Sequence, residues 1–242
     1  MSSQPSRTVQ ATETSITILE ALHDLGQAGV TELSNQLSLS KGNVHKHLTT
    51  LEQNEFVVNE GGVYSLSHRF LELGKEVQRS TPASEHVVPL LESVAESVGD
   101  SAFFAVKEHE KVVYLLVVSR PNGVNPGIEG RRYPLSETAS GKVILAFGDT
   151  TNPTPPDTEG ADSISAKQRS QIRDNELVIR TPSDESFSEL AVPVRHHSDG
   201  LVGVVGLFTD SRDHDEFSNE YRRLLQSTSE RIAKRIAWNQ SN

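Results

Sequence analysis

The stretch "LSLSKGNVHKHLTTLEQNEFV", residues Leu37 to Val57, carries the pattern that decides the fold of the N-terminal part. It has no acidic residue before Glu52, although the whole chain has a formal net charge of −10. Its apolar residues Val44, Leu48 and Leu51 follow the i, i+4, i+7 spacing of a helix with one buried face. The opposite face of that helix is therefore polar and basic.

The neighbouring segments complete a recognisable arrangement. Residues 14–29 carry a helical apolar stripe, and "VTELSNQL", residues 30–37, predicts a short helix with Thr31 as its N-cap. Ser40 is the expected N-cap of the helix that follows. "FVVNEGGVYSL", residues 56–66, predicts a β-hairpin, because Asn-Glu-Gly-Gly separates two apolar runs. Together these elements predict a winged helix-turn-helix, whose second helix enters the major groove of DNA.

The outward face of that helix holds the candidate DNA-binding residues. Acidic side chains would repel phosphate, so their absence from Leu33 to Leu51 fits DNA binding. Asn43 is suited to adenine, Lys41 or Lys46 to guanine or phosphate, and Gly42 lets the backbone approach DNA closely. The candidates are Thr31, Ser40, Lys41, Gly42, Asn43, His45, Lys46 and Thr49. A helical packing module with a solvated basic face is the alternative.

Composition narrows the class of protein. The chain has 242 residues, no cysteine and a mean hydropathy of −0.42, which excludes disulfides and predicts a soluble cytoplasmic protein without a membrane span. Asp and Glu number 33, against 8 Lys and 15 Arg, which predicts a salt-in halophile; an ordinary acidic protein is the alternative. Residues 1–80 hold 6 basic and 9 acidic residues, a net charge of −3. At 1 M salt the Debye length is about 3 Å, so near contacts decide DNA binding.

The remaining segments predict a second domain. "HRFLELGKEVQRS", residues 68–80, predicts a linker helix that ends at Thr81 and Pro82. Residues 83–99 predict a helix with Pro89 in its first turn. Further helices are expected from Ser136, near 165–175 and over 215–239, with strands over 101–108, 111–120, 186–197 and 200–209 and a surface loop over 150–163. Helices flanking such strands predict an α+β domain.

Three segments carry a resemblance to a known family: residues 39–57, "GRRYPLSETASGKVILA" at 130–146 and "LAVPVRHHSDGLVGVVGLF" at 190–208. Their order resembles the IclR family of transcriptional regulators. The resemblance implies an α+β fold: an N-terminal winged helix-turn-helix, joined by a linker helix to a GAF-like α/β effector-binding domain. It implies that residues 12–80 bind a palindromic operator in double-stranded DNA. Residues 84–240 would bind a small-molecule effector and form a homodimer or tetramer.

The start of the helix near Ser136 is the candidate effector site. With Ser136 as N-cap, the amides of Glu137 to Ser140 would lack helical partners and would suit a carboxylate or phosphate. An ordinary capped helix is the alternative. The resemblance implies that the effector contacts Tyr133, Ala139, Ser140, Phe187, Glu189, Gly206 and Phe208.

Three of these positions depart from the family pattern. The family commonly has a small or thiol residue where Glu189 stands, and Ser where Gly206 and Phe208 stand. Glu189 would repel an anion unless it paired with Arg131 or Arg132. The pocket is therefore either filled or suited to a polyol or a cation.

No other motif predicts catalysis or cofactor binding. His196 and His197 are adjacent in a strand, so they cannot chelate one metal ion, and no metal site is predicted. Ser140-Gly141-Lys142 lacks the upstream glycine of a phosphate-binding loop. We therefore expect a regulator rather than an enzyme, with no cofactor. The competing hypothesis is a constitutive DNA-binding regulator whose C-terminal domain only dimerises.

Overall fold

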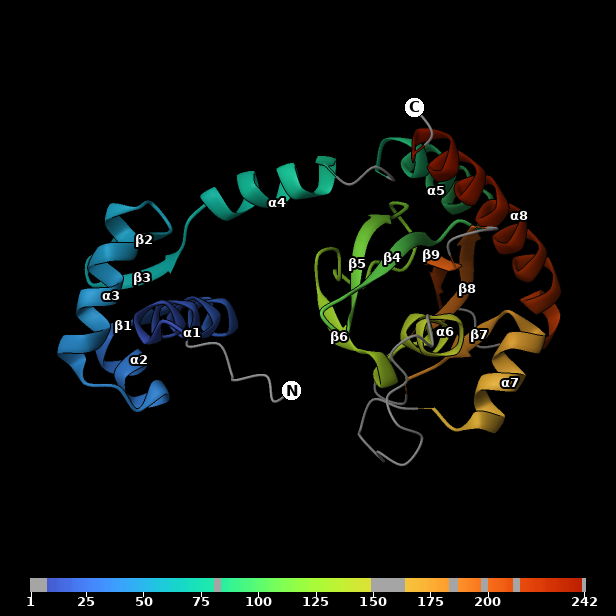
Figure 1. Cartoon of the computed structure of the whole chain (residues 1–242). Helices are drawn as coiled ribbons and strands as arrows, with labels where there is room; N and C mark the ends of the chain where they lie inside the picture. Colours follow the sequence, from blue (N-terminus) through green and yellow to red (C-terminus); the bar gives the residue numbers. More distant parts are fainter. Residues whose placement is uncertain are drawn as a thin grey trace. The chain divides into compact units, whose positions relative to one another are not determined.

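The computed structural model describes residues 8–80, 84–148, 164–182, 187–196, 200–210 and 214–240. The chain divides into two compact units, Met1–Val77 and Gln78–Asn242 (Figure 1). The functional boundaries, 12–80 and 84–240, stay a prediction. Three predicted features lie outside the described residues: the loop over 150–163, the helix end at Thr81 and Pro82, and the turn residues Ser198 and Asp199.

The N-terminal unit is a winged helix-turn-helix. Its helices are α1 (Gln10–Leu25), α2 (Val30–Leu37) and α3 (Lys41–Gln53). Its antiparallel sheet has the order β1-β3-β2, formed by β1 (Gln27–Gly29), β2 (Val57–Glu60) and β3 (Val63–Leu66). The core between helices and sheet is apolar and includes Ile18, Leu22, Leu33, Val44 and Leu48. The predicted helix, turn, helix and hairpin are thus all present.

The two helix starts differ in how they are capped. Ser40 caps α3 as predicted, and its hydroxyl accepts a hydrogen bond from the Asn43 amide at 3.2 Å. The predicted cap at Thr31 is wrong, because α2 begins at Val30 and Gly29 occupies the N-cap position. Gly29 is extended and pairs with Val63 in the sheet, so α2 begins where β1 ends.

The wing is a tight hairpin. Gly61 and Gly62 connect β2 to β3 with φ angles of 64° and 93°, which glycine adopts without strain. The Asn59 side-chain oxygen accepts a hydrogen bond from the Gly62 amide at 2.9 Å. The sequence pattern Asn-x-Gly-Gly therefore fixes the register of the wing.

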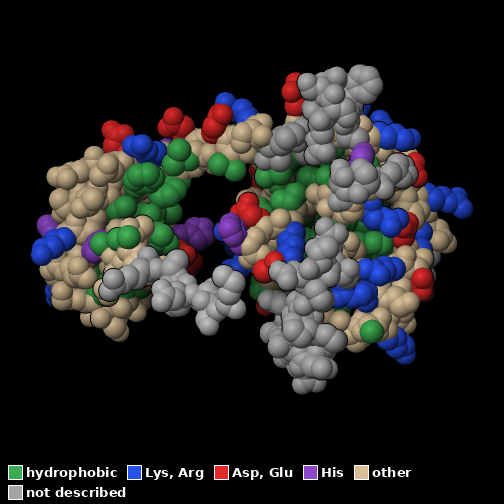
Figure 2. Space-filling view, in the orientation of Figure 1, with side chains coloured by type: hydrophobic (Ala, Val, Ile, Leu, Met, Phe, Trp, Pro, Cys, Tyr) green, Lys and Arg blue, Asp and Glu red, His purple; other side chains and the backbone are tan. Residues whose placement is uncertain are grey.

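Helix α4 (Arg69–Ser80) follows the wing and contains the boundary between the two units. It has no buried residue, and the Leu71 and Leu73 side chains are 60% and 45% exposed. Figure 2 shows hydrophobic side chains on the surface at this helix. The predicted linker helix is therefore present, and it exposes apolar side chains on its surface.

The C-terminal unit is built on a six-stranded antiparallel sheet of order β6-β5-β4-β9-β8-β7. The strands are β4 (Ser101–Glu108), β5 (Lys111–Val118), β6 (Arg132–Pro134), β7 (Val178–Arg180), β8 (Ser188–His196) and β9 (Gly200–Thr209). In the two central strands β4 and β9 apolar residues run almost without interruption, since helices cover both faces of the sheet.

Helices α5 (Ser84–Val98) and α8 (His214–Gln240) pack on one face of the sheet. Helix α6 (Ala139–Phe147) packs on the other, next to α7 (Ala166–Asn175) (Figure 1). Pro89 is the sixth residue of α5 and not in its first turn, so that prediction is wrong. It lies on the exposed side of the helix, where a broken backbone hydrogen bond is open to water.

Residues of β8 and β9 alternate between the two faces as predicted. Leu190, Val192 and Leu207 join the core beneath α5 and α8. Ala191, Val204 and Phe208 join the core beneath α6. Among the described helices, none has both the length and the apolar character needed to cross a membrane.

Candidate DNA-binding surface and effector site

Helix α3 presents the two faces that its sequence predicts. Val44, Leu48 and Leu51 are buried against the rest of the unit. On the other side the side chains of Lys41, His45 and Lys46 are exposed, as is Gly42, while Asn43 and Thr49 are half-buried. The remaining candidates, Thr31 and Ser40, are exposed at the starts of α2 and α3.

The two histidines of α3 differ in their surroundings. The His47 ring is 2.8 Å from the Ser15 hydroxyl, a hydrogen bond that ties α3 to α1. His45 is exposed, and the Thr49 hydroxyl donates to its backbone oxygen at 2.9 Å. Only His45 therefore belongs to the outward face.

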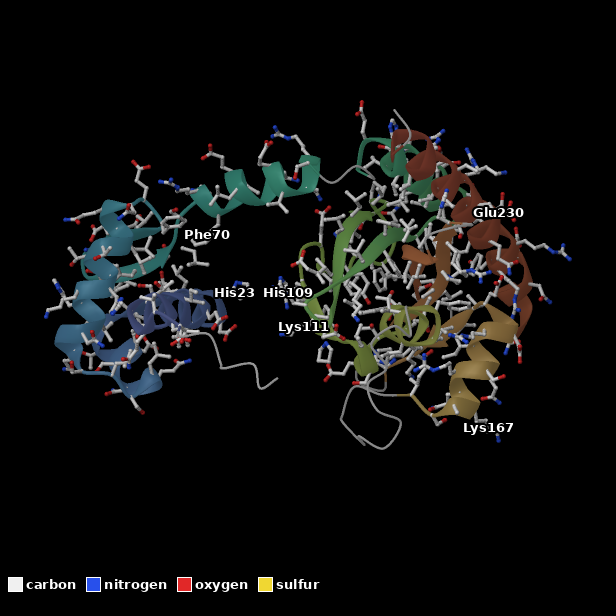
Figure 3. The ribbon with its side chains drawn as sticks, viewed as in Figure 1. His23, Phe70, His109, Lys111, Lys167 and Glu230 are labelled. Atoms are coloured by element: carbon white, nitrogen blue, oxygen red, sulfur yellow. The ribbon has the colours of Figure 1, made fainter. Side chains whose placement is uncertain are left out.

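Arg69 partly neutralises the negative charge of Glu55, which follows α3. The Arg69 guanidinium donates to the Asn54 carbonyl at 2.8 Å and lies 3.4 Å from the Glu55 carboxylate. It also lies over the Phe56 ring, 4.9 Å from its centre, and Phe70 from α4 packs on the same ring at 5.4 Å (Figure 3). The sequence patterns did not reveal this role for Arg69, because it lies in the segment read as a linker.

The start of α6 differs from its prediction. Residues Leu135–Glu137 form a short 3-10 turn, η1, so the α-helix begins only at Ala139. Thr138 is extended and is the N-cap, with its hydroxyl accepting a hydrogen bond from the Gly141 amide at 2.9 Å. Ser136 is therefore not the cap. Gly141 is required by packing: a Cβ atom there would lie 2.0 Å from the Leu135 carbonyl oxygen.

The Glu189 carboxylate, from strand β8, occupies the N-terminus of α6. Its Oε2 accepts a hydrogen bond from the Ala139 amide at 2.7 Å. Its Oε1 accepts bonds from the Ser140 amide at 3.0 Å, the Ser140 hydroxyl at 2.6 Å and the Tyr114 hydroxyl at 2.7 Å. Two of the four amides that were predicted to be available to an anion, those of Ala139 and Ser140, are therefore already bound to a carboxylate.

Because the Glu189 carboxylate is buried, these four hydrogen bonds must replace the water that it has lost. The Glu189 side chain is 3% exposed, and Ala139 and Ser140 are 0% exposed. A carboxylate that loses its water must be compensated by protein donors, and a helix N-terminus favours negative charge. Burial, and next the charge of Glu189, raise the pKa of the Tyr114 hydroxyl well above its usual range. Tyr114 therefore stays protonated and remains a donor.

An aromatic cluster surrounds the carboxylate. The rings of Phe103 and Phe208 lie 4.5 Å apart, and the Tyr114 ring contacts both, at 5.2 and 5.6 Å. Phe187 and Tyr133, both half-buried, extend the cluster, with rings 5.6 Å from Phe208 and 5.7 Å from Tyr114. Gly206 has no room for a side chain, because a Cβ atom would lie 2.3 Å from the Phe103 ring.

The structure thus gathers the seven predicted residues around the start of α6: Tyr133, Ala139, Ser140, Phe187, Glu189, Gly206 and Phe208. The predicted partners of Glu189 are wrong, because Arg131 is exposed and Arg132 pairs with Glu108 at 3.5 Å. The actual partners are uncharged. Tyr114 was missed; alternation in β5 places it on the same face as Val112, but no motif connects it to Glu189.

The described ranges contain no group of three His, Asp or Glu side chains placed to hold a metal ion.

The winged helix with its basic outward face defines the class of the N-terminal unit as DNA-binding. Residues 12–61 match the IclR helix-turn-helix domain. The N-terminal unit therefore contains a DNA-binding domain of the IclR type.

Relatives extend the likeness over most of the chain. The HTH-type transcriptional regulator KdgR of Escherichia coli (strain K12) is 24% identical, over 91% of this chain and 90% of its own length. The fold is that of an IclR transcriptional regulator from Alicyclobacillus acidocaldarius, with a TM-score of 0.75, 20% identity and coverage of 95% of this chain and 100% of that one. An IclR homolog of Microbacterium hydrocarbonoxydans, solved in complex with 4-hydroxybenzoate, gives a TM-score of 0.68 at 17% identity, covering 87% and 92% of the two chains.

These likenesses confirm two predictions. The fold is an N-terminal helix-turn-helix followed by an α/β domain, as in the IclR regulators. The matched family and the relatives are transcriptional regulators and not enzymes, as the sequence led us to expect.

Proposed function

We propose that this protein is a transcriptional regulator of the IclR family that binds a palindromic operator through α3. Its C-terminal unit would sense a small molecule and change operator affinity. Couplings of this kind are typically about 1–3 kcal/mol, or about 5–150-fold in affinity.

The observation that carries the DNA-binding role is the outward face of α3. Lys41, His45 and Lys46 are all exposed, and no acidic residue occurs in the helix before Glu52. Asn43 is half-buried at the start of the helix, and in the proposed complex it would contact a base edge while the lysines contact phosphate or guanine. A face of this kind on an IclR-type domain is suited to the major groove.

The effector role is supported by the position of the site and by the relatives. The seven candidate residues meet at one helix start, with Tyr133 and Phe187 as the half-buried members through which a ligand would approach. One structural relative was solved with 4-hydroxybenzoate. We propose that a small molecule acts at the corresponding place in this chain.

A homodimer, or a tetramer built from it, would present two copies of α3 to a palindrome. The exposed apolar side chains of α4, Leu71 and Leu73, support an association through this helix. Replacing both with Asp should weaken the dimer and with it operator binding.

The main test is operator binding by two α3 variants. Genome-wide occupancy would first identify the operator; mobility shifts at matched salt would then compare wild type with Asn43→Ala and Lys46→Ala. Each variant should lose about 1–3 kcal/mol of binding free energy if its side chain contacts a base. Lys167→Ala is the matched control, because Lys167 is an exposed lysine on α7 (Figure 3). Wild-type affinity in both α3 variants would refute the assignment of α3 as the recognition helix.

One observation favours a second candidate function, a constitutive regulator whose C-terminal unit only dimerises. The Glu189 carboxylate already takes the amides at the start of α6. Operator affinity unchanged across a broad screen of metabolites would support this candidate, whereas a ligand-dependent change would support sensing.

A further inference from the structure

The Glu189 carboxylate is held as a bound anion would be held. Two successive amides at the start of a nine-residue helix and two hydroxyls donate to it, over distances of 2.6 to 3.0 Å. These donors come from β5 and α6, while the carboxylate comes from β8. The arrangement is an anion-binding site whose occupant is attached to the chain.

Among the residues that the structure describes, Glu189 forms no ion pair. Arg180 lies opposite it in the register of β7 and β8, and Arg132 pairs instead with Glu108. The negative charge is instead stabilised by the helix N-terminus and the hydroxyl dipoles. A free carboxylate could use the same donors only if Glu189 left them, and beside Glu189 it would meet a like charge in a buried, aromatic setting.

We infer that Glu189 is a tethered ligand: its carboxylate occupies the anion site formed by α6, Ser140 and Tyr114 and excludes carboxylate effectors from it. The C-terminal unit is thereby kept in the arrangement that a bound carboxylate would otherwise produce. The inference rests on the proposed function only where it concerns the response of DNA binding.

The test removes the Glu189 carboxylate by mutation and adds a free carboxylate, acetate, to the solution. Glu189→Ala deletes the carboxylate and its CH₂ group, which together correspond in size to acetate. In the full-length variant, acetate at 100 times its dissociation constant should raise the ratio of folded to unfolded protein about a hundredfold, seen as a higher melting temperature. Wild type should not respond. Acetamide has the same shape without the charge and should be far less effective.

Glu108→Ala is the matched control, because it removes a half-exposed glutamate from β4 of the same unit. If acetate stabilises this control or wild type as much as Glu189→Ala, the inference is wrong. It is also wrong if folded Glu189→Ala ignores acetate. Should Glu189→Ala not fold alone, acetate present during refolding should recover folded protein and acetamide should not; equal recovery with both, or none, overturns the inference.

DNA binding separates this inference from the proposed function. Acetate should change the operator affinity of Glu189→Ala by about 5- to 150-fold and leave that of wild type unchanged. If acetate stabilises the variant but its operator affinity does not change, Glu189 is a tethered ligand whose site is not coupled to DNA binding; the sensing role is decided separately, by the metabolite screen on the wild type.

Discussion

Replacing Tyr114 with Phe tests the energetic importance of the carboxylate cluster. The change removes one hydroxyl donor, 2.7 Å from Glu189 Oε1, and retains a ring that packs against both Phe103 and Phe208. Hydrogen bonds to charged groups contribute about 1.5–3 kcal/mol, so we expect the free energy of unfolding to fall by about 2 kcal/mol. The buried carboxylate would keep three donors, all from Ala139 and Ser140.

Urea unfolding followed by tryptophan fluorescence measures this loss, since the single tryptophan, Trp238, lies in α8 of the C-terminal unit. With an m-value of about 2 kcal/mol/M, the midpoint should fall by about 1 M. Tyr133→Phe is the matched control: its ring contacts Tyr114 but is half-buried, and we expect a change within about 0.5 kcal/mol. Equal, small losses in the two variants would refute the stabilising role of the Tyr114 hydroxyl.

Three further predictions follow from the same features. Lys41 and Lys46 are the only Lys or Arg residues within 8–68, so a dimer would neutralise about four phosphates with them. A plot of log operator affinity against log salt concentration should then have a slope of about −3.6, and a slope near −10 would contradict this. Because the pKa of Tyr114 is raised in the folded state, its hydroxyl contributes fully to the free energy of unfolding below the unfolded pKa of about 10, and this contribution is lost as pH rises toward the folded pKa. The free energy of unfolding, measured at increasing alkaline pH, should therefore fall less in Tyr114→Phe than in wild type. Gly206→Ala should destabilise by about 1–3 kcal/mol or more in urea unfolding, because its Cβ would lie 2.1 Å from the Leu190 carbonyl oxygen; Gly42→Ala, with no atom within 4 Å, should leave stability equal or higher.

The N-terminal unit could be predicted closely because its signals are local. Val44, Leu48 and Leu51 define the buried face of α3 within a single helix, and Gly61-Gly62 defines the turn of the wing. The cap of α2 was missed because it depends on a partner distant in sequence. Gly29 is fixed by pairing with Val63, and the helix therefore begins at Val30, one residue before Thr31.

The candidate effector residues lie close together, but the sequence did not predict how they are arranged. Strand alternation placed Phe187, Glu189 and Ala191 on one face, and the structure confirms that Ala191 and Phe187 pack beneath α6. No sequence pattern indicated that the 3-10 turn η1 would shift the start of the α-helix from Ser136 to Ala139. A shift of this size decides which amides are available, since only the first turn of a helix has amides without helical partners.

The partner of Glu189 could not be found by matching charges. A buried acid invites a search for a basic residue, and Arg131 and Arg132 are near in sequence to the helix start. The chain instead uses uncharged donors, from residues 49, 50 and 75 positions away, which no sequence pattern connects to a glutamate. This choice has a physical consequence. An arginine partner would have been another charge to bury, whereas amides that a helix start leaves unpaired need an acceptor in any case. Placing a glutamate opposite α6 therefore satisfies the carboxylate and the helix together, and it does so at the position where a separate anion would otherwise bind.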